Sequence, residues 1–428
     1  MRKAVFAIAG AIIVAAALAA VAGAWQTRTV PGVTDNNITS SDLISTTITN
    51  ADDPFKPIPD SNLPKLRDSS IKVEKVVDGL SEPTSMTFVG SNSNNLLVTQ
   101  KEGDLRLVKD GVLHSEPLLS FKVETASERG LVGVAYAKDK VFLYMTEKSG
   151  FDIRNRVYSY DLQNGTLSGK KMILDLPGTP GPNHDGGKMI VGPDGYLYAV
   201  IGDLNRNGVL QNYKNAGAPD NTSVILKVAP DGKPAANVLS GAAGLEGYYA
   251  YGVRNGFGIE FDPRTGKLWD TENGPDRYDE INVVEPGFNS GWERVMGPIS
   301  RAQAGEGDLA MFGGAHYSDP VFSWLQSMGV TDIEFLNSTK LGDKYAYNVF
   351  TGDINNGNLY YFTVNEKRDG LVLKGDLSDR VADNDTEASE VTLGTGFGGI
   401  TDIETGPDGY LYILSYASGS IYRIMPAT

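Results

Sequence analysis

His184 is one of only three histidines in the 428-residue chain, and it lies in a segment that could carry acid–base chemistry. The segment GPNHDGGKMIVGPDGYLYAVIGD (181–203) places it between two glycine-rich turns, directly before a strand-like run. An imidazole near its intrinsic pKa can take up a proton at neutral pH. Gly186 and Gly187 would let a ligand or another backbone segment approach closely. The alternative is a turn histidine that caps a strand or faces solvent.

Other polar groups precede strand-like runs in the same way, although they lie far apart in the sequence. They are Glu128-Arg129, Arg254-Asn255 and Asp332. A carboxylate, an imidazole and a guanidinium that converge would form a polar site. A further segment, TENGPDRYDE (271–280), concentrates oxygen atoms. Its acidic side chains are more typical of a solvated loop than of metal ligands.

A turn-plus-strand unit repeats along the chain and would position these residues. Asp-Gly and related turns between β runs are typical of hairpins, and their regular repetition is typical of propeller blades. The six copies are NSNNLLVTQKEG (92–103), AKDKVFLYMTE (137–147), GPDGYLYAVIGD (192–203), FDPRTGKLWDTEN (261–273), KLGDKYAYNVFTGD (340–353) and GPDGYLYILSY (406–416). The sequence therefore predicts an all-β fold, a six-bladed β-propeller over residues 71–428, with a β-sandwich as the alternative.

The predicted propeller also indicates how the ring closes and where polar residues meet. The last blade would use residues 401–404, 411–415 and 420–424, and its outer strand would come from residues 71–77. The first strand of each blade lines the central channel, so residues directly before those strands gather at one mouth of it. We therefore expect Glu128, Asn183, His184, Arg254, Asn255 and Asp332 at that mouth.

The composition restricts the classes of partner. The formal net charge of −15 and the pI near 4.7 argue against nucleic acid, because phosphate binding needs a basic surface. The same acidity is compatible with Ca²⁺ sites. The chain has no cysteine and therefore neither a disulfide nor a c-type haem motif. Its fold must be held by its core, by metals, or by both.

The N-terminal region predicts export. Residues 1–24 have a short basic start, a long apolar run and an Ala-Gly-Ala cleavage site, which favours a signal peptide or a membrane anchor. Residues 25–70 are predicted to be a flexible polar stalk. The expected location is the exterior: secreted, on the cell surface or in a periplasmic-type space. Sequons that would allow glycosylation there start at Asn37, Asn164, Asn221, Asn337 and Asn384.

In several ordered motifs the chain resembles the soluble sugar dehydrogenases that use pyrroloquinoline quinone (PQQ), the glucose/sorbosone dehydrogenase family. The most specific stretches are RGLVGVAY (129–136), HDGGKMIVGPDGYLYAVIGD (184–203), YGVRNGFGIEFDP (251–263) and TENGPDRYDEINVVEPGFNSGW (271–292). The resemblance implies an oxidoreductase that oxidises the C1 hydroxyl of an aldose sugar to a lactone by hydride transfer to PQQ. It also implies a bound Ca²⁺ and an external electron acceptor.

The resemblance assigns roles to individual positions. His184 lies where the family carries the general base that takes the proton from the sugar hydroxyl. Asn183 lies where the glucose enzyme has an acidic neighbour, and an amide would not raise the basicity of the histidine as a carboxylate would. The positions that match cofactor or substrate contacts are Gln100, Asn183, Arg254 and Asn255. The backbone carbonyls that match Ca²⁺ ligands are those of Gly274 and Pro275.

The match fails where the glucose enzyme meets the three carboxylates of the cofactor with a lysine and two arginines. The corresponding residues here are Asn355, Gly399 and Thr401. Anionic groups without partners would weaken binding. Two other functions therefore stay open: a cofactor-free binding propeller on the cell surface and a Ca²⁺-dependent lactonase-type hydrolase. The hydrolase would need carboxylates around a central metal, and the expected channel positions show few.

Overall fold

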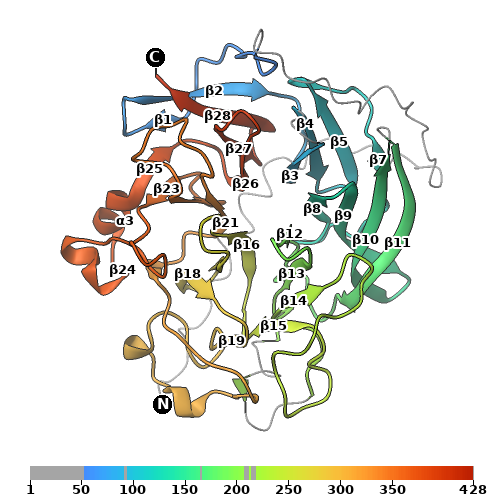
Figure 1. The fold of residues 1–428 in the computed structure, drawn as a ribbon, viewed down its shortest axis with the longest axis vertical. Helices are drawn as coiled ribbons and strands as arrows, with labels where there is room; N and C mark the ends of the chain where they lie inside the picture. Colours follow the sequence, from blue (N-terminus) through green and yellow to red (C-terminus); the bar gives the residue numbers. More distant parts are fainter. Residues whose placement is uncertain (1–52, 91–93, 164–165, 207–211, 214–217, 428) are drawn as a thin grey trace, which may run out of the picture. The chain divides into compact units, whose positions relative to one another are not determined.

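The computed structural model describes residues 53–90, 94–163, 166–206, 212–213 and 218–427. These residues form six mainly antiparallel β-sheets of four or five strands, arranged as blades around one axis (Figure 1). The inner strand of each blade packs against the inner strands of its two neighbours, which closes the ring. The predicted all-β, six-bladed propeller is thereby confirmed.

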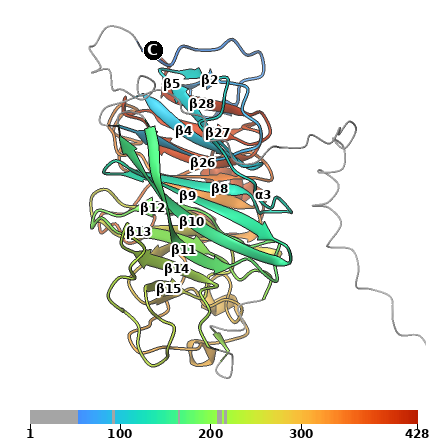
Figure 2. The same ribbon diagram turned by 90° about the vertical axis from the view of Figure 1, so that its right-hand side faces the viewer.

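The blades follow one another along the sequence, and each starts with the strand nearest the axis. Blade 1 contains β3 (Pro83–Val89), β4 (Asn95–Gln100), β5 (Asp104–Lys109), β6 (Val112–Leu113) and β7 (Leu119–Ser120). Blade 2 contains β8 (Leu131–Ala137) and the long strands seen at the side of the propeller in Figure 2: β9 (Lys140–Ser149), β10 (Asp152–Gln163) and β11 (Thr166–Pro177). Blade 3 contains β12 (Met189–Val191), β13 (Leu197–Ile201), β14 (Val224–Val228), β15 (Tyr248–Tyr251) and β19 (Phe288–Asn289).

The remaining three blades include strands that come from distant parts of the chain. Blade 4 contains β16 (Gly256–Phe261), β17 (Leu268–Glu272), β18 (Arg277–Val284), β20 (Phe322–Gln326) and β24 (Val381–Ala382). Blade 5 contains β21 (Val330–Phe335), β22 (Val349–Asp353), β23 (Leu359–Phe362), β25 (Thr392–Thr395) and β1 (Lys65–Leu66). Blade 6 contains β26 (Ile400–Thr405), β27 (Leu411–Ser415), β28 (Ser420–Pro426) and β2 (Ile71–Val77). The connections hold a short helix, α3 (Asp385–Val391), and three 3-10 turns, η1 (Ile299–Arg301), η2 (Glu306–Asp308) and η3 (Gly375–Asp379).

The repeated GPDG turn forms because its aspartate bonds to both the backbone and a side chain of the next strand. In blade 3, Asp194 accepts from the backbone N–H of Tyr196 at 3.2 Å and from the hydroxyl of Tyr198 at 3.0 Å. Gly195 takes the left-handed conformation (φ 80°) that this turn requires. Asp408 makes the equivalent two bonds in blade 6. Each of the six predicted copies covers all or most of the second strand of a different blade.

The N-terminal strand closes the ring, as predicted. β2 pairs antiparallel with β28, so the first strand of the domain is the outer strand of the last blade. The guanidinium of Arg423 on β28 is buried at this junction. Its ion-pair partners are Asp53 at 2.6 Å, Glu74 at 3.1 Å and Asp408 at 3.3 Å. Because these partners come from both ends of the chain, the ion cluster joins the two ends of the propeller.

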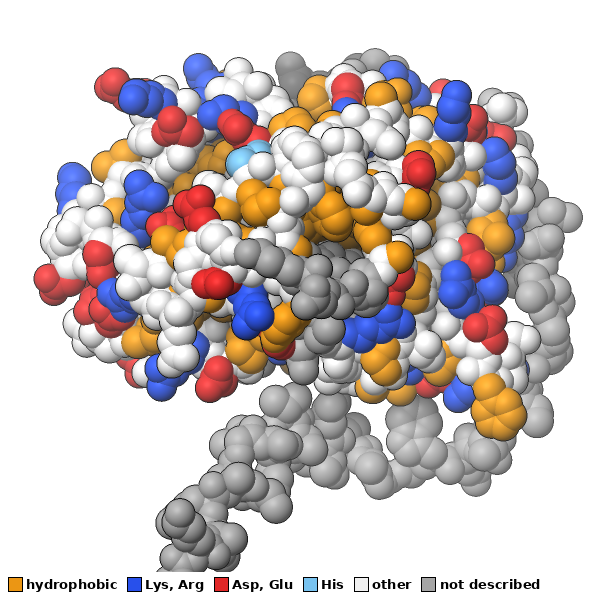
Figure 3. Space-filling view, turned by 90° about the horizontal axis from the view of Figure 1, so that it is seen from below, with side chains coloured by type: hydrophobic (Ala, Val, Ile, Leu, Met, Phe, Trp, Pro, Cys, Tyr) orange, Lys and Arg blue, Asp and Glu red, His pale blue; other side chains and the backbone are white. Residues whose placement is uncertain are grey.

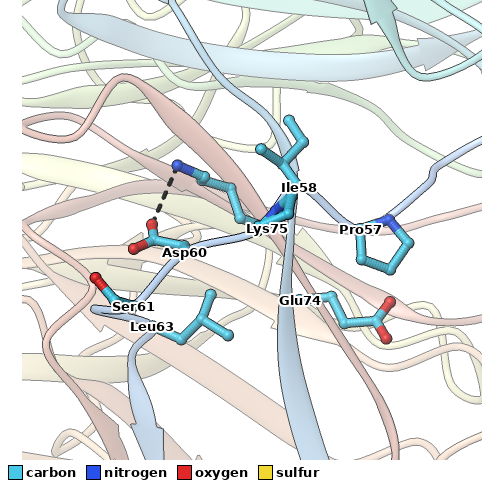
Figure 4. Close-up of a pocket in the computed structure, with 8 residues that line it drawn as sticks. Pro57, Ile58, Asp60, Ser61, Leu63, Glu74 and Lys75 are labelled. Carbon is cyan, nitrogen blue, oxygen red and sulfur yellow. Dashed lines mark ion pairs between the residues drawn. The ribbon is translucent and has the colours of Figure 1, made fainter.

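The predicted boundary of the stalk at residue 70 is wrong, because described residues before it already pack on the propeller. Phe55 is buried in the core, and β1 pairs with β25 of blade 5. A cavity of about 550 Å³ lies between this segment and β2, where Lys75 forms an ion pair with Asp60 (Figure 4). Phe55 and Leu66 are isolated apolar residues in a polar stretch, so the composition did not reveal their contacts with the core.

Several predictions lie outside the described residues: the signal or anchor at 1–24, the part of the stalk at 25–52 and the sequons at Asn37 and Asn164. No helix in the described part of the chain is long and apolar enough to cross a membrane. On the side of the molecule at the bottom of Figure 1, acidic and basic side chains are interspersed with hydrophobic ones (Figure 3).

Three charged side chains meet inside the channel and link its inner strands. Lys188, directly before β12, forms ion pairs with Asp332 on β21 and Asp402 on β26, both at 2.8 Å. Both aspartates are fully buried. Asp402 also accepts from the backbone N–H of Met86, and Asp332 from that of Ile403. The cluster connects blades 1, 3, 5 and 6, so Asp332 lies within the channel and not at the mouth where it was expected.

Replacing the central lysine should destabilise the propeller strongly. Lys188→Met leaves two buried aspartates without their cation, and we expect a loss of about 3–5 kcal/mol in the free energy of unfolding. The loss should be larger at pH 8 than at pH 5, because protonation can relieve the aspartates at low pH. Lys72→Met is the control, since Lys72 pairs with Glu74 at the surface and should contribute less than about 1 kcal/mol. Equal losses in urea or thermal unfolding would contradict the axial role of Lys188.

Candidate active site

Residues that precede three inner strands meet at one mouth of the channel, as the propeller geometry predicts. The backbone N–H of His184, before β12, donates to the Glu128 carboxylate, before β8, at 2.6 Å. The side-chain amide of Asn255, before β16, lies 3.4 Å and 3.5 Å from the two oxygens of the same carboxylate. Burial raises the pKa of Glu128, against the opposing influence of the His184 charge. Glu128 therefore joins blades 2, 3 and 4 around the candidate base.

His184 is paired with a carboxylate that orients its ring. Its Nδ1 lies 2.5 Å from Oδ1 of Asp203, a fully buried residue two positions after the end of β13. The other oxygen of Asp203 accepts from the indole N–H of Trp292 at 2.8 Å. Burial alone would raise the pKa of Asp203. The hydrogen bond and the charge of His184, together with the hydrogen bond from Trp292, outweigh burial and lower the pKa of Asp203. An ionised Asp203 accepts a hydrogen bond from Nδ1–H of His184. The unprotonated Nε2 of the same ring is then the atom that can act as a base.

Asp203 was not predicted from the sequence, although the signal was present. The hairpin β12–β13 returns the chain to the level of His184, and Asp203 is the polar residue at its end. The carboxylate that the amide at 183 does not provide is thus supplied by Asp203. The side-chain oxygen of Asn183 instead accepts from the hydroxyl of Ser127, and its backbone N–H donates to Asn205 at 3.1 Å. Asn183 is thus part of the loop that surrounds His184.

Arg254 and Asn255 present buried polar atoms that have no partner among the described residues. These atoms are the Nε donor of Arg254 and the Oδ1 acceptor of Asn255. The guanidinium of Arg254 lies over the ring of Trp292, with 5.2 Å from its carbon to the ring centroid. Since Trp292 also holds Asp203, the arginine and the His184 pair share one support. One donor and one acceptor left open beside a base fit a polar ligand such as a quinone cofactor.

The turn between β17 and β18 carries the predicted metal ligands and is rigidly held. The N–H of Gly274 donates to Asp279 at 3.0 Å, and the Asn273 side chain donates to the carbonyl of Val330 at 2.6 Å. Asp279 is fully buried, as are Glu272 and Glu280 of the same hairpin, so the expectation of a solvated loop is wrong for these acids. In the described part of the chain no group of three or more His, Cys, Asp or Glu side chains could hold a metal ion. The assignment of the Gly274 and Pro275 carbonyls to Ca²⁺ stays a prediction.

Among the described residues, no hydrogen bond joins the side chain of Gln100 to Glu128, His184 or Asn255. Its side-chain oxygen accepts from the N–H of Ser81 at 2.9 Å and from Arg106 at 3.4 Å, which ties it to neighbouring segments of blade 1. The predicted contact of Gln100 with cofactor or substrate stays a prediction.

The three positions that lack the expected cations differ in their surroundings. Gly399 has φ 82°, and a Cβ there would lie 2.9 Å from the carbonyl oxygen of Ile354. The hydroxyl of Thr401 donates to the carbonyl of Pro83 at 2.9 Å, and Asn355 is exposed. An arginine at Gly399 would therefore strain the backbone, so it is not a suitable way to restore a positive charge.

The other end of the channel is lined by carboxylates, contrary to the expectation that channel positions show few. Glu260, Glu334 and Glu404 occupy equivalent places in β16, β21 and β26 and line a cavity of about 320 Å³. Oε1 of Glu334 accepts from the N–H of Thr405 at 3.0 Å. Burial first, and then the charge of Glu404, raise the pKa of Glu260 to about 8. Burial also raises the pKa values of Glu334 and Glu404 above their ordinary range.

The raised pKa of Glu260 predicts a pH-dependent stability. Between its ordinary value of 4.5 and about 8, the folded protein holds a proton that the unfolded chain releases, so the free energy of unfolding falls as the pH rises through this range. Glu260→Gln cannot lose that proton and should show a smaller fall in melting temperature from pH 5 to pH 9. Glu366→Gln, at an exposed position, is the control and should follow the wild type. Parallel curves for all three proteins would contradict the assignment.

The comparisons with known proteins agree with this geometry. A β-propeller with a histidine–carboxylate pair at its channel mouth, beside an Arg-Asn pair with unpartnered polar atoms, has the features of a propeller oxidoreductase. A family model described as Glucose / Sorbosone dehydrogenase matches residues 80–423. The chain therefore belongs to the glucose/sorbosone dehydrogenase family and is an oxidoreductase of that family.

Individual relatives cover nearly the whole propeller. Aldose sugar dehydrogenase YliI of Escherichia coli strain K12 is 27% identical over 374 residues, which are 84% of this chain and 94% of that protein. The crystal structure of the soluble aldose sugar dehydrogenase from Escherichia coli in the apo-form has a TM-score of 0.66 at 25% identity and covers 83% of this chain and 99% of that one. The PQQ-bound aldose sugar dehydrogenase from Streptomyces coelicolor shares the fold, with a TM-score of 0.61 at 22% identity over 84% of this chain and 99% of that one.

Proposed function

We propose that the protein oxidises the C1 hydroxyl of an aldose sugar to a lactone, with PQQ as the hydride acceptor. The observation that supports this most directly is the pair of His184 and Asp203 at the channel mouth, beside the unpartnered atoms of Arg254 and Asn255. A general base and an open donor–acceptor pair in one place are what such a reaction requires. The similarity to an aldose sugar dehydrogenase over 84% of the chain supports the substrate class.

In this proposal His184 is the general base. The bond from Nδ1–H to Asp203 leaves Nε2 to accept the proton of the C1 hydroxyl, and the ionised Asp203 stabilises the imidazolium that forms. The electron pair of the C1–H bond leaves as hydride, and the C1–O bond becomes the lactone carbonyl. PQQ, when bound, supplies the two-electron acceptor for that hydride. An external electron acceptor would then take the electrons from the protein.

Arg254 and Asn255 carry the unpartnered polar atoms that would hold the cofactor. Arg254 would donate to an oxygen of the cofactor, and Asn255 would accept a hydrogen bond from the cofactor or substrate. The backbone carbonyls of Gly274 and Pro275 would bind Ca²⁺, a hard cation that prefers oxygen ligands. Export to the cell exterior and glycosylation are part of the same proposal. Of the described sequon residues, Asn337 and Asn384 are exposed.

A cofactor-free binding propeller is the second candidate, and one observation favours it. The positions Asn355, Gly399 and Thr401 carry no positive charge to meet an anionic cofactor. The lactonase-type hydrolase is less well supported, because no group of metal-binding side chains is found among the described residues. Reconstitution separates the first two candidates. If the protein with PQQ and Ca²⁺ shows no change in absorbance and reduces no dye with any aldose, the binding propeller is the better account.

Two variants test the base and its partner. His184→Ala should lower turnover by roughly 10²–10⁴-fold, the usual share of a positioned general base. Asp203→Asn should lower it by roughly as much, because a side-chain amide that donates to Nδ1 turns Nε2 into a donor. In both variants the affinity for PQQ should fall much less than turnover. The measurements are dye reduction with a panel of aldoses and a PQQ titration by absorbance.

His114→Ala is the matched control, since it removes one of the two other histidines, which lies in blade 1 away from the mouth. Its turnover should equal that of the wild type. Full turnover in His184→Ala would remove the histidine from the mechanism, whereas loss in His184→Ala with full turnover in Asp203→Asn would remove only the orienting role of Asp203.

A further inference from the structure

The guanidinium of Arg254 is bound to the turn that would hold the metal. Its Nη1 donates to the carbonyl of Asn273 at 2.8 Å and to that of Gly274 at 2.9 Å. Two successive carbonyls that converge on one positive group resemble the arrangement in which carbonyl oxygens ligate a hard cation. One of the two, Gly274, is also a carbonyl assigned to Ca²⁺ in the proposed function.

The direction of these carbonyls is fixed by the opposite side of the turn. The Gly274 N–H is held by Asp279, whose second oxygen accepts from the backbone N–H groups of Met328, Gly329 and Val330 at 2.8, 2.7 and 3.1 Å. A Cβ at Gly274 would lie 1.8 Å from the carbonyl oxygen of Arg277, so a larger residue does not fit. The carbonyls are therefore preorganised toward the position of the guanidinium, and they do not need Arg254 to orient them.

Contacts outside the turn also hold the backbone and the guanidinium of Arg254 in place. Its backbone N–H donates to Glu272 at 2.6 Å, and its guanidinium lies over Trp292. Nε of the same group is buried without a partner in the described part of the chain. Nη1 of Arg254 is thus hydrogen-bonded to the turn, while Nε is left to donate to a ligand.

We infer that Arg254 is a built-in counter-cation that competes with the metal for the Gly274 carbonyl. This inference rests on the proposed function, because it takes Ca²⁺ at this carbonyl as its starting point. Without metal, Nη1 satisfies the preorganised oxygens and stabilises the turn. Metal binding replaces that hydrogen bond and frees the guanidinium for an anionic ligand. Binding of the metal and binding of the anionic ligand are therefore coupled, and each should raise the affinity for the other.

The competition is measured in the cofactor-free full-length protein by calorimetric titration with Ca²⁺ alone. Arg254→Gln removes a positive charge next to the carbonyls and should lower the Ca²⁺ dissociation constant by about tenfold or more. Arg254→Lys keeps the charge and should bind Ca²⁺ with an affinity close to that of the wild type. Arg277→Gln is the matched control, because it removes an exposed arginine from the same hairpin, and it should change the constant by less than about twofold.

Thermal unfolding gives a second readout that does not depend on activity. In chelator, Arg254→Gln should melt below the wild type, since the Asn273 and Gly274 carbonyls lose their donor. Saturating Ca²⁺ should then raise its melting temperature by more than it raises that of the wild type, because a ligand that binds more tightly stabilises more at equal concentration. A cooperative melt in each condition also shows that the variant is folded.

The outcomes separate this inference from the proposed function. If the wild type binds Ca²⁺ and Arg254→Gln binds it no more tightly than Arg277→Gln does, the competition is refuted and the metal role stands. If neither the wild type nor Arg254→Gln binds Ca²⁺, both the competition and the metal role are refuted. Binding by Arg254→Gln that exceeds binding by the wild type and the control supports the competition, whether or not the loaded protein oxidises a sugar.

Discussion

The position of the candidate base depends on the ion cluster at the propeller axis. Lys188 is held there by two buried aspartates, and only three residues separate it from His184. Of these, Gly186 and Gly187 lie against the backbone of β13. A Cβ on Gly186 would come within 2.3 Å of the carbonyl oxygen of Val200, to which Gly187 donates at 3.1 Å. Since larger residues do not fit between them, fixing Lys188 on the axis also fixes His184 at the mouth.

Buried carboxylates hold the rest of the mouth in place by accepting backbone N–H groups from other segments. The acceptor–donor pairs are Glu128 with His184, Glu272 with Arg254 and Asp279 with Gly274. Each bond fixes the backbone of a residue to which the proposed function assigns a role. A carboxylate buried in this way has a structural task that differs from metal binding or catalysis. This explains why so many acids surround the site without forming a group of metal ligands in the described residues.

The sequence predicted what depends on local pattern and missed what depends on contacts between distant segments. The six copies of the turn-plus-strand unit were sufficient for the propeller, for its closure by β2 and for the meeting of Glu128, His184 and Asn255. Asp203 was missed because its role appears only when the hairpin β12–β13 returns it to the histidine. The burial of Glu272, Asp279 and Glu280 could not be predicted, because an acidic residue near a turn has the same local pattern whether water or a neighbouring blade lies against it. Phe55 was missed for a similar reason, since one apolar residue in a polar stretch has no periodicity.

The charge balance at the mouth bears on how the site could accept an anionic cofactor. Asp203 is held in its charged form, and Arg254, the basic group beside it, is bound to the turn. Burial raises the pKa of Glu128, whose carboxylate accepts the backbone N–H of His184. In the proposed function a divalent cation at the Gly274 carbonyl adds positive charge and frees the guanidinium together. The metal and Arg254 would then supply, from one side of the channel, the positive charge that Asn355, Gly399 and Thr401 do not provide from the other blades.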